Sequence, residues 1–192
     1  MKHSSTRELF EYWNMRRGVR FAPERGEIEP GAIRRALGDS FILAVDPDAG
    51  HPFRLAGTRI CALFCRELKS EPFARMWERD SKPSFDEVLK IVTDDAAGVV
   101  AGVTGHAGED LTIDLELMLL PLSQGGRTHL RMIGALAPLS VPYWLGVHPV
   151  DRLELRTLRH MSAAMMPAAR SRLMQRAEGT RPSLVVHQGG RS

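Results

Sequence analysis

Residues 99–138 read VVAGVTGHAGEDLTIDLELMLLPLSQGGRTHLRMIGALAP. The stretch is rich in β-branched and apolar residues, and two turn signals divide it, Gly108-Glu109-Asp110 and Gln124-Gly125-Gly126. Such short turns join antiparallel neighbours, because a parallel crossover needs a dozen or more residues. The sequence therefore predicts a three-stranded antiparallel meander, with strands over 99–105, 112–122 and 128–138.

The residues before the meander predict two more strands and a helical connection. An apolar run at 40–45 is closed by the turn signal 46–50, and alternation resumes at 53–56, which is typical of a hairpin. Helical spacing follows, in a short helix capped by Thr58 and in a second helix over 84–97. We therefore expect an α+β fold: one five-stranded antiparallel sheet with helices on one face, able to enclose a small pocket.

The N-terminal segment predicts an added helix. Ser5 and Glu8 have the spacing of a capping box, and an aromatic stripe follows. The stripe must be buried on the domain or on a second copy of the chain, so the dimer-interface candidates are Leu9, Phe10, Tyr12 and Trp13. Glu29-Pro30 and Gly38 then delimit a short helix of about two turns.

Length and charge divide the chain into unequal parts. Its 192 residues fit one domain on a prior of roughly 100 to 200 residues per domain. The net charge of +3 is uneven: residues 151–192 hold eight basic and three acidic residues, against 18 and 20 in residues 1–150. We expect an N-terminal helical extension over 1–38, a core over 39–140, a C-terminal extension over 141–177 and a disordered tail over 178–192. Within 152–174, Leu153-Glu154-Leu155-Arg156 alternates like a strand, whereas the remainder has helical spacing.

The cysteine content and the hydropathy of the chain bear on its expected cellular location. The two cysteines are too few to staple a secreted scaffold. The first residues show no apolar segment of a signal peptide, and no window approaches the roughly 20 apolar residues that span a bilayer. We expect a cytoplasmic protein without integral membrane association.

Several segments together resemble a PAS sensor domain, and specifically a family of small bacterial single-domain PAS proteins. They include Leu9-Phe10-Glu11-Tyr12-Trp13, the run from Phe53 to Ile60, Leu63-Phe64-Cys65-Arg66-Glu67-Leu68 and Leu119-Leu120-Pro121-Leu122, within roughly residues 7 to 158. The resemblance implies a non-catalytic sensory or interaction module, a five-stranded antiparallel sheet with flanking helices, often dimeric through the N-terminal helix. It names no ligand, since related sheets hold haem, flavin, small acids or nothing.

One residue departs from the family pattern. A glycine is usual before Arg-Glu-Leu in the family, and Cys65 stands there in this chain. If the position needs a positive φ, a non-glycine residue costs on the order of 1 kcal/mol.

Pocket candidates follow from the expected space between sheet and helices. The apolar candidates are Leu55, Ile60, Phe64, Phe73, Trp77, Leu89, Met118 and Met132, with a filled core as the alternative. Trp77 is the most informative of them, because its indole N–H needs a partner when it is buried. Arg54, Thr58 and Arg59 could hold an anionic ligand. We favour a structural role for this trio, in which Arg54 pairs with Glu67 or Asp39.

Metal, cofactor and catalytic signals are weak. Cys61 and Cys65 share a helical face, but a closed zinc site needs four ligands, and His51 and His106 are isolated in sequence. We expect no metal, no covalently bound cofactor, and neither haem nor flavin. Asp114 and Glu116 are expected together on the exposed face of a strand. No nucleophile motif, phosphate loop or dinucleotide fingerprint occurs, so we expect no enzymatic activity.

Two function hypotheses remain. The favoured one is a cytoplasmic PAS-type sensory or regulatory module that forms a homodimer and signals by binding a small ligand or a protein partner. The alternative is a protein that binds nucleic acid or an anionic membrane through its basic C-terminal tail. The tail lacks interleaved aromatic residues and the rest of the chain is net acidic, which disfavours nucleic acid as the partner.

Overall fold

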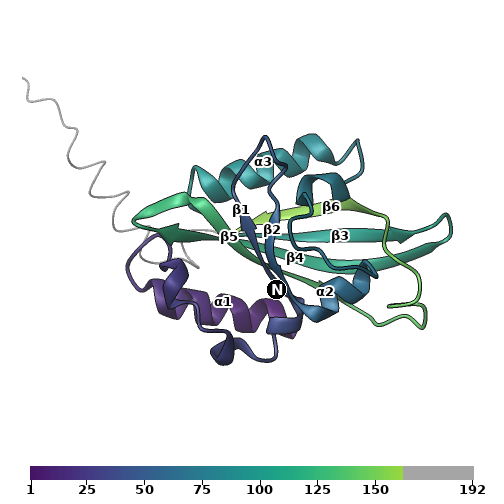
Figure 1. Ribbon diagram of the computed structural model, residues 1–192, viewed down its shortest axis with the longest axis horizontal. Helices are drawn as coiled ribbons and strands as arrows, with labels where there is room; N and C mark the ends of the chain where they lie inside the picture. Colours follow the sequence, from purple (N-terminus) through teal and green to yellow (C-terminus); the bar gives the residue numbers. More distant parts are fainter. Residues whose placement is uncertain (162–192) are drawn as a thin grey trace, which may run out of the picture.

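The structure is a computed structural model that describes residues 1–161, with the side chains of 128 and 129 excepted. Its centre is a six-stranded sheet in the order β2-β1-β5-β4-β3-β6, and every pairing is antiparallel (Figure 1). The strands are β1 (Ser40–Ala44), β2 (Phe53–Ala56), β3 (Val99–Ala107), β4 (Leu111–Gln124), β5 (Arg127–Pro138) and β6 (Arg152–His160). The α-helices are α1 (Ser4–Arg17), α2 (Thr58–Leu63) and α3 (Lys82–Thr93), and the 3₁₀ turns are η1 (Arg25–Glu27), η2 (Pro30–Ile33), η3 (Leu37–Asp39) and η4 (Phe73–Met76).

The predicted α+β architecture is confirmed. β1 and β2 form the expected hairpin, and β3, β4 and β5 form the expected meander. β1 closes the arrangement by pairing with β5, from Ser40 opposite Ala135 to Ala44 opposite Arg131. Tight turns joining antiparallel neighbours therefore account for the order of these strands.

A sixth strand corrects the predicted count of five. β6 pairs with β3 along its whole length, so the start of the expected C-terminal extension is part of the sheet. The strand interpretation of Leu153-Glu154-Leu155-Arg156 is thus correct and extends to His160. The rest of 152–174 and the tail over 178–192 lie outside the described residues.

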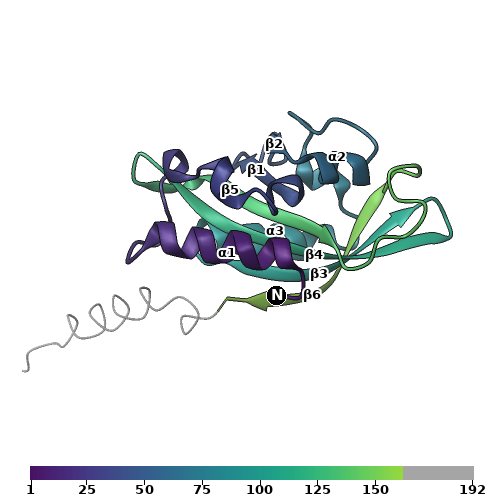
Figure 2. The same ribbon diagram turned by 90° about the horizontal axis from the view of Figure 1, so that it is seen from below.

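Two apolar layers cover the two faces of the sheet. On one face α2, η4 and α3 pack over alternate residues such as Phe41 and Leu43. On the other face α1 covers the sheet (Figure 2), and its apolar residues pack against Ile42 of β1 and Met118 of β4. Because both faces are covered, β4 is buried from Leu115 to Ser123. The added N-terminal helix therefore forms a layer of its own.

Local details differ from two sequence expectations. His3, and not Ser5, is the N-cap of α1, with its Nδ1 accepting from the Ser5 amide at 3.1 Å. The Ser5 hydroxyl instead donates to Asp39 at 2.6 Å, since a buried carboxylate is the stronger acceptor. The expected two-turn helix at 30–38 is split into η2 and η3. No helix within residues 1–161 is both long and apolar enough to cross a membrane.

Candidate functional site

The predicted pocket residues do not converge on one cavity. Six of them are buried in the layer between the sheet and α2, η4 and α3, namely Ile60, Phe64, Phe73, Trp77, Leu89 and Met132. Met118 is buried on the opposite face under α1, because it follows the inward-facing Leu117 by one residue on β4. Leu55 is 39% exposed on the edge strand β2. These two assignments to the pocket are therefore corrected.

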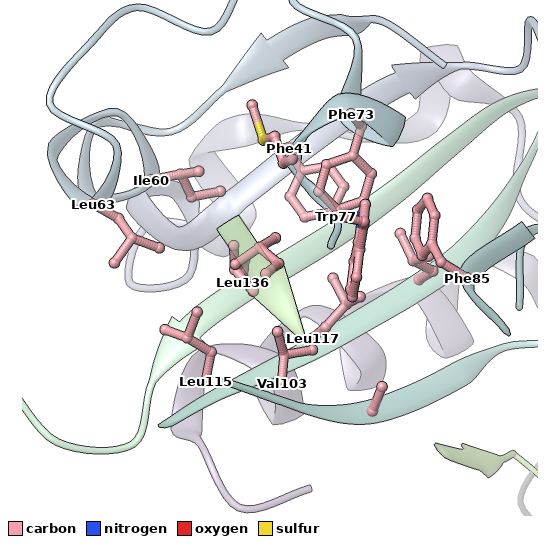
Figure 3. Packing of buried hydrophobic residues seen from close by; sticks show 14 of the residues in the cluster. Phe41, Ile60, Leu63, Phe73, Trp77, Phe85, Val103, Leu115, Leu117 and Leu136 are labelled. Carbon is pink, nitrogen blue, oxygen red and sulfur yellow. The ribbon is translucent and has the colours of Figure 1, made fainter. Parts of the chain in front are cut away.

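An aromatic cluster fills the layer between the sheet and the α2–α3 side. Phe73 lies at its centre, with ring centroids 5.2 Å from Phe53 and Phe85 and 5.7 Å from Trp77. Trp77 stacks on Phe85 with centroids 4.2 Å apart and planes 16° apart (Figure 3). The resemblance leaves haem and flavin open, and either group would have to displace these rings to enter the layer, because the rings pack directly against one another.

Trp77 carries an unpaired polar atom inside this cluster. The residue is 5% exposed, and its Nε1 is the one buried side-chain N or O atom without a hydrogen-bond partner among residues 1–161. Trp13 shows the ordinary alternative, since its Nε1 donates to the Pro121 carbonyl at 2.8 Å. A buried donor left unpaired costs about 1–3 kcal/mol. Trp77 is thus the position where the aromatic cluster would gain most from an added acceptor.

The polar trio separates into three environments. Arg59 binds Asp39 through Nε and Nη2, both at 2.7 Å, which makes it a structural residue. Thr58 is the exposed first residue of α2, whose N-cap is Gly57, so Thr58 does not cap the helix. Arg54 is exposed and forms no ion pair within the described residues, so its expected pairing with Glu67 or Asp39 is wrong. Asp39 already forms its ion pair with Arg59.

The predicted dimer residues are buried within one chain. Leu9 and Trp13 are fully buried under the sheet, and Phe10 and Tyr12 are 8% and 6% exposed. The Tyr12 hydroxyl donates to the Glu27 carbonyl at 3.0 Å and accepts from the Glu29 amide at 2.9 Å. The four side chains therefore have no free surface for a second copy, and their assignment as the interface is corrected. The aromatic stripe could have packed on the sheet of its own chain or on a second copy, and in the structure it packs on the sheet of its own chain.

Glu116 is the second buried acidic residue that holds the N-terminal segment. It is 5% exposed and accepts from the Lys2 amide at 2.6 Å, from the His3 amide at 2.9 Å and from the Thr6 hydroxyl. Burial by itself would raise the pKa of Glu116, but these hydrogen bonds outweigh it and hold the pKa below its usual value. The expected exposure is thus correct for Asp114 alone, because the start of α1 covers Glu116.

A cavity of about 260 Å³ adjoins Glu116 at the edge of the α1 layer. Its apolar lining includes Val100, Leu115 and Leu139, and Lys2 and Arg159 also line it. The N-terminal segment and β6 meet there only in the folded chain, so no local sequence pattern predicts this cavity. It contains no buried polar atom without a partner among the described residues.

Glu78, His106 and Glu154 form a cluster that the sequence did not suggest. One potential ligand atom from each lies within 4.8 Å of the others, although the residues come from three separate segments. Arg152 Nε binds Glu78 at 2.7 Å, and Arg156 Nη1 binds Glu154 at 2.6 Å. Two guanidinium groups thus already neutralise the two carboxylates that a cation would need. The cluster is better explained as an ion-pair network that fastens β6 to the segment before α3.

The two cysteines lie on or just after α2 with different exposures. Cys61 is half-buried, and burial raises the pKa of its thiol. Cys65 is exposed and has φ = 51°, in the left-handed region that favours glycine. The backbone conformation inferred from the family's glycine is therefore present, with cysteine in its place.

Comparison with known proteins places these features in a family. The sequence profile of a family described as PAS domain matches residues 1–137. The structure is similar to a light-oxygen-voltage domain studied with a flavin analogue, at 13% identity and a TM-score of 0.46 over 57% of this chain and 83% of that one. It is similar to the LOV protein of Rhodobacter sphaeroides at 13% identity and a TM-score of 0.45, over 57% of this chain and 66% of that one.

A larger protein also matches. The blue-light activated histidine kinase of Erythrobacter litoralis is similar at 10% identity and a TM-score of 0.44, over 76% of this chain. The match spans 42% of the kinase, so more than half of that protein has no counterpart here. A comparison with curated proteins gives no match.

Proposed function

The chain belongs to the PAS domain family, and from this premise we propose that it is a non-catalytic, cytoplasmic sensory and regulatory module. In this proposal the module binds a small ligand on the α2–α3 side of the sheet and transmits the signal by docking a protein partner. The observation that carries the ligand part is the unpaired Nε1 of Trp77 within the aromatic cluster.

The ligand must bring a hydrogen-bond acceptor to Trp77. The rings of Phe73 and Phe85 surround the indole, so an entering ligand has to displace one of them. The unmet hydrogen bond lowers the net cost of that displacement, because the ligand restores about 1–3 kcal/mol that the closed cluster forgoes. Ligand binding would thus be coupled to a movement of η4 and the start of α3, which carry Phe73 and Phe85. Such coupling is what a sensory module needs.

Absence of catalysis is supported by how the acidic groups are used. Glu116 and Asp39 are each saturated by neighbouring donors, and Glu78 and Glu154 are paired with arginines. A general base requires a group free to take a proton near a substrate cavity. The acidic groups that the fold buries or clusters are committed to holding segments together.

Native mass spectrometry of the purified protein, with an absorbance spectrum, tests the ligand part. We expect a retained small molecule in the wild-type protein and its loss in Trp77→Phe, which removes the donor and keeps an aromatic ring. Trp144→Phe is the matched control, because Trp144 is also buried in the same layer and its Nε1 is not a buried donor without a partner. Retention by Trp77→Phe as strong as in wild type, or no retained mass in any variant, would contradict the ligand proposal.

We also propose that the chain forms a homodimer, through a surface other than the aromatic residues of α1. Val141, Tyr143 and Val147 in the loop between β5 and β6 are 78%, 91% and 71% exposed. Exposed apolar residues so close together are typical of an interaction site. Light scattering should show a dimer that Tyr143→Lys converts to a monomer, with Asp110→Lys as a control at another exposed turn. A monomeric wild-type protein would contradict this part.

A further inference from the structure

Three arginines without an acidic partner lie on or beside neighbouring strands of the sheet, since Arg25 lines one groove with Ile42 of β1, Leu55 of β2 and Ile133 of β5. Arg25 begins η1, Arg54 lies on β2 and Arg131 lies on β5. Arg131 is half-buried and donates from Nε to the Gln124 amide oxygen at 3.2 Å. Within residues 1–161, no carboxylate forms an ion pair with any of the three. We call Arg25, Arg54 and Arg131 the arginine surface.

The three charges act on one another. Burial lowers the pKa of Arg131 most, and the positive charges of Arg54 and Arg25 lower it further. Arginines are normally placed where an acceptor offsets their charge, and like charges held together raise the free energy of the unbound surface. An incoming anion would remove that repulsion.

Acidic groups near the arginine surface are already used. Glu24 accepts from the Ser123 hydroxyl at 2.7 Å and from the amides of Gly126 and Gly125 at 3.0 and 3.1 Å. Glu27 pairs with Arg20 at 2.9 Å. The two acids nearest to Arg25 in sequence therefore hold the β4–β5 turn and the segment after α1, and they leave the arginine surface without a counter-charge.

A small apolar groove lies against Arg25 and against Leu55, the residue that follows Arg54 on β2. Its volume is about 30 Å³, and Arg25 is one of its lining residues. Ile28, Ile33, Ile42, Leu55 and Ile133 form most of its apolar wall. Leu55 is 39% exposed there, although leucine is usually buried. The groove has room for the end of one apolar side chain and little more.

We propose that the arginine surface and this groove dock an acidic peptide segment of a partner protein. One apolar side chain of the segment enters the groove beside Leu55, and carboxylates on either side bind the guanidinium groups of Arg54 and Arg131. Charge complementarity selects an acidic partner, and the apolar groove selects a peptide over a bare anion. The inference deepens the proposed function, because it names the face and the chemistry of the partner through which the module would signal.

Fluorescence anisotropy with a labelled peptide of alternating glutamate and leucine tests the docking. We expect the double variant Arg54→Gln/Arg131→Gln to weaken binding by about tenfold or more, because it removes two charge-assisted hydrogen bonds. Leu55→Ala should weaken it as well. Arg79→Gln is the matched control, an exposed arginine before α3 without a described partner, and it should leave the dissociation constant unchanged.

Three results would overturn the proposal. One is equal binding of the peptide by the double variant. Another is binding of inorganic phosphate or a DNA oligonucleotide at least as tight as that of the peptide. The third is a lower melting temperature in the double variant than in Arg79→Gln, because removal of mutually repelling charges should leave the folded state at least as stable.

A further variant separates this inference from the ligand proposal. Trp77→Phe should still bind the peptide, because Trp77 packs in the layer on the α2–α3 side, away from the apolar groove. Peptide binding by Trp77→Phe without any retained ligand would therefore support the docking face and contradict only the ligand part of the proposed function. Loss of peptide binding in Trp77→Phe, with the fold intact by circular dichroism, would count against the docking face.

Discussion

Arg59 and Asp39 form a two-pronged ion pair, with Nε–Oδ1 and Nη2–Oδ2 both 2.7 Å long. The pair joins the start of α2 to the residue directly before β1, and Asp39 also accepts from Ser5 of α1. One buried carboxylate thus links the N-terminal helix, the first strand and the second helix. The N-terminal layer is in this way tied to the PAS core.

Arg59→Gln should destabilise the protein. It leaves Asp39, whose side chain is 2% exposed, with a single strong donor. We expect the free energy of unfolding, measured by urea denaturation, to fall by about 1–2 kcal/mol. This is toward the lower end of the cost of leaving a buried carboxylate without its partner, because Arg59 itself is half-exposed. Arg66→Gln, at an exposed position without a described partner, should change stability by less than about 0.5 kcal/mol. Equal effects of the two substitutions would contradict the role given to Arg59.

Glu116 should make stability depend on acid pH. Its pKa in the folded protein lies below the unfolded value of about 4.3, so the stabilising contribution is present above that value and is lost as pH falls through the folded pKa. Glu116→Gln removes the titration, and its stability should vary less than that of wild type between about pH 5 and pH 3. Denaturation curves across this range measure the difference. Asp114→Asn serves as the exposed control on the same strand, and parallel curves for wild type and Glu116→Gln would exclude this role.

Cys65→Gly should stabilise the fold. The φ of 51° at Cys65 is strained for a residue with a Cβ and is ordinary for glycine. We expect the free energy of unfolding to rise by roughly 0.5–1 kcal/mol. This is the net effect, because the relief of strain is partly opposed by the greater entropy of glycine in the unfolded chain. Ala62→Gly, at an exposed position within α2, should cost about the same amount. If both glycines destabilise, the left-handed conformation does not strain Cys65.

Leu9→Ala should reduce stability and leave the oligomeric state unchanged. Leu9 is fully buried between α1 and the sheet of its own chain. Truncation of such a leucine costs about 2–5 kcal/mol, which thermal unfolding will detect. Light scattering on the folded variant should give the mass of the wild type. A change in mass with unaltered stability would restore the aromatic stripe as the interface between copies.

Much of the architecture was predictable because it depends on local signals. Turn residues such as Gly108 and Gly125 have positive φ, and they join strands whose alternation is visible in the sequence. Antiparallel pairing then follows from the shortness of the turns. The sixth strand was only partly foreseen, because its pairing with β3 joins residues about fifty positions apart.

Side-chain roles were predicted less well, because they depend on what covers each residue. Alternation placed Asp114 and Glu116 on one face, but only α1 determines that Glu116 is buried beneath it. Arg54 and Arg59 looked equivalent, and a single acid, Asp39, distinguishes them by accepting Arg59. The arginine surface has no sequence signature, since Arg25, Arg54 and Arg131 are far apart in the chain.

The sequence by itself determined the α+β class, the hairpin and the meander, since turn chemistry and residue alternation act over a few residues. Only the tertiary structure decided that α1 covers its own sheet, that Trp77 keeps an unpaired donor in a filled layer, and that Asp39 pairs with Arg59 and not with Arg54. The physical reason is that burial and electrostatic interaction depend on neighbours in space. Those neighbours are set by the packing of the whole chain.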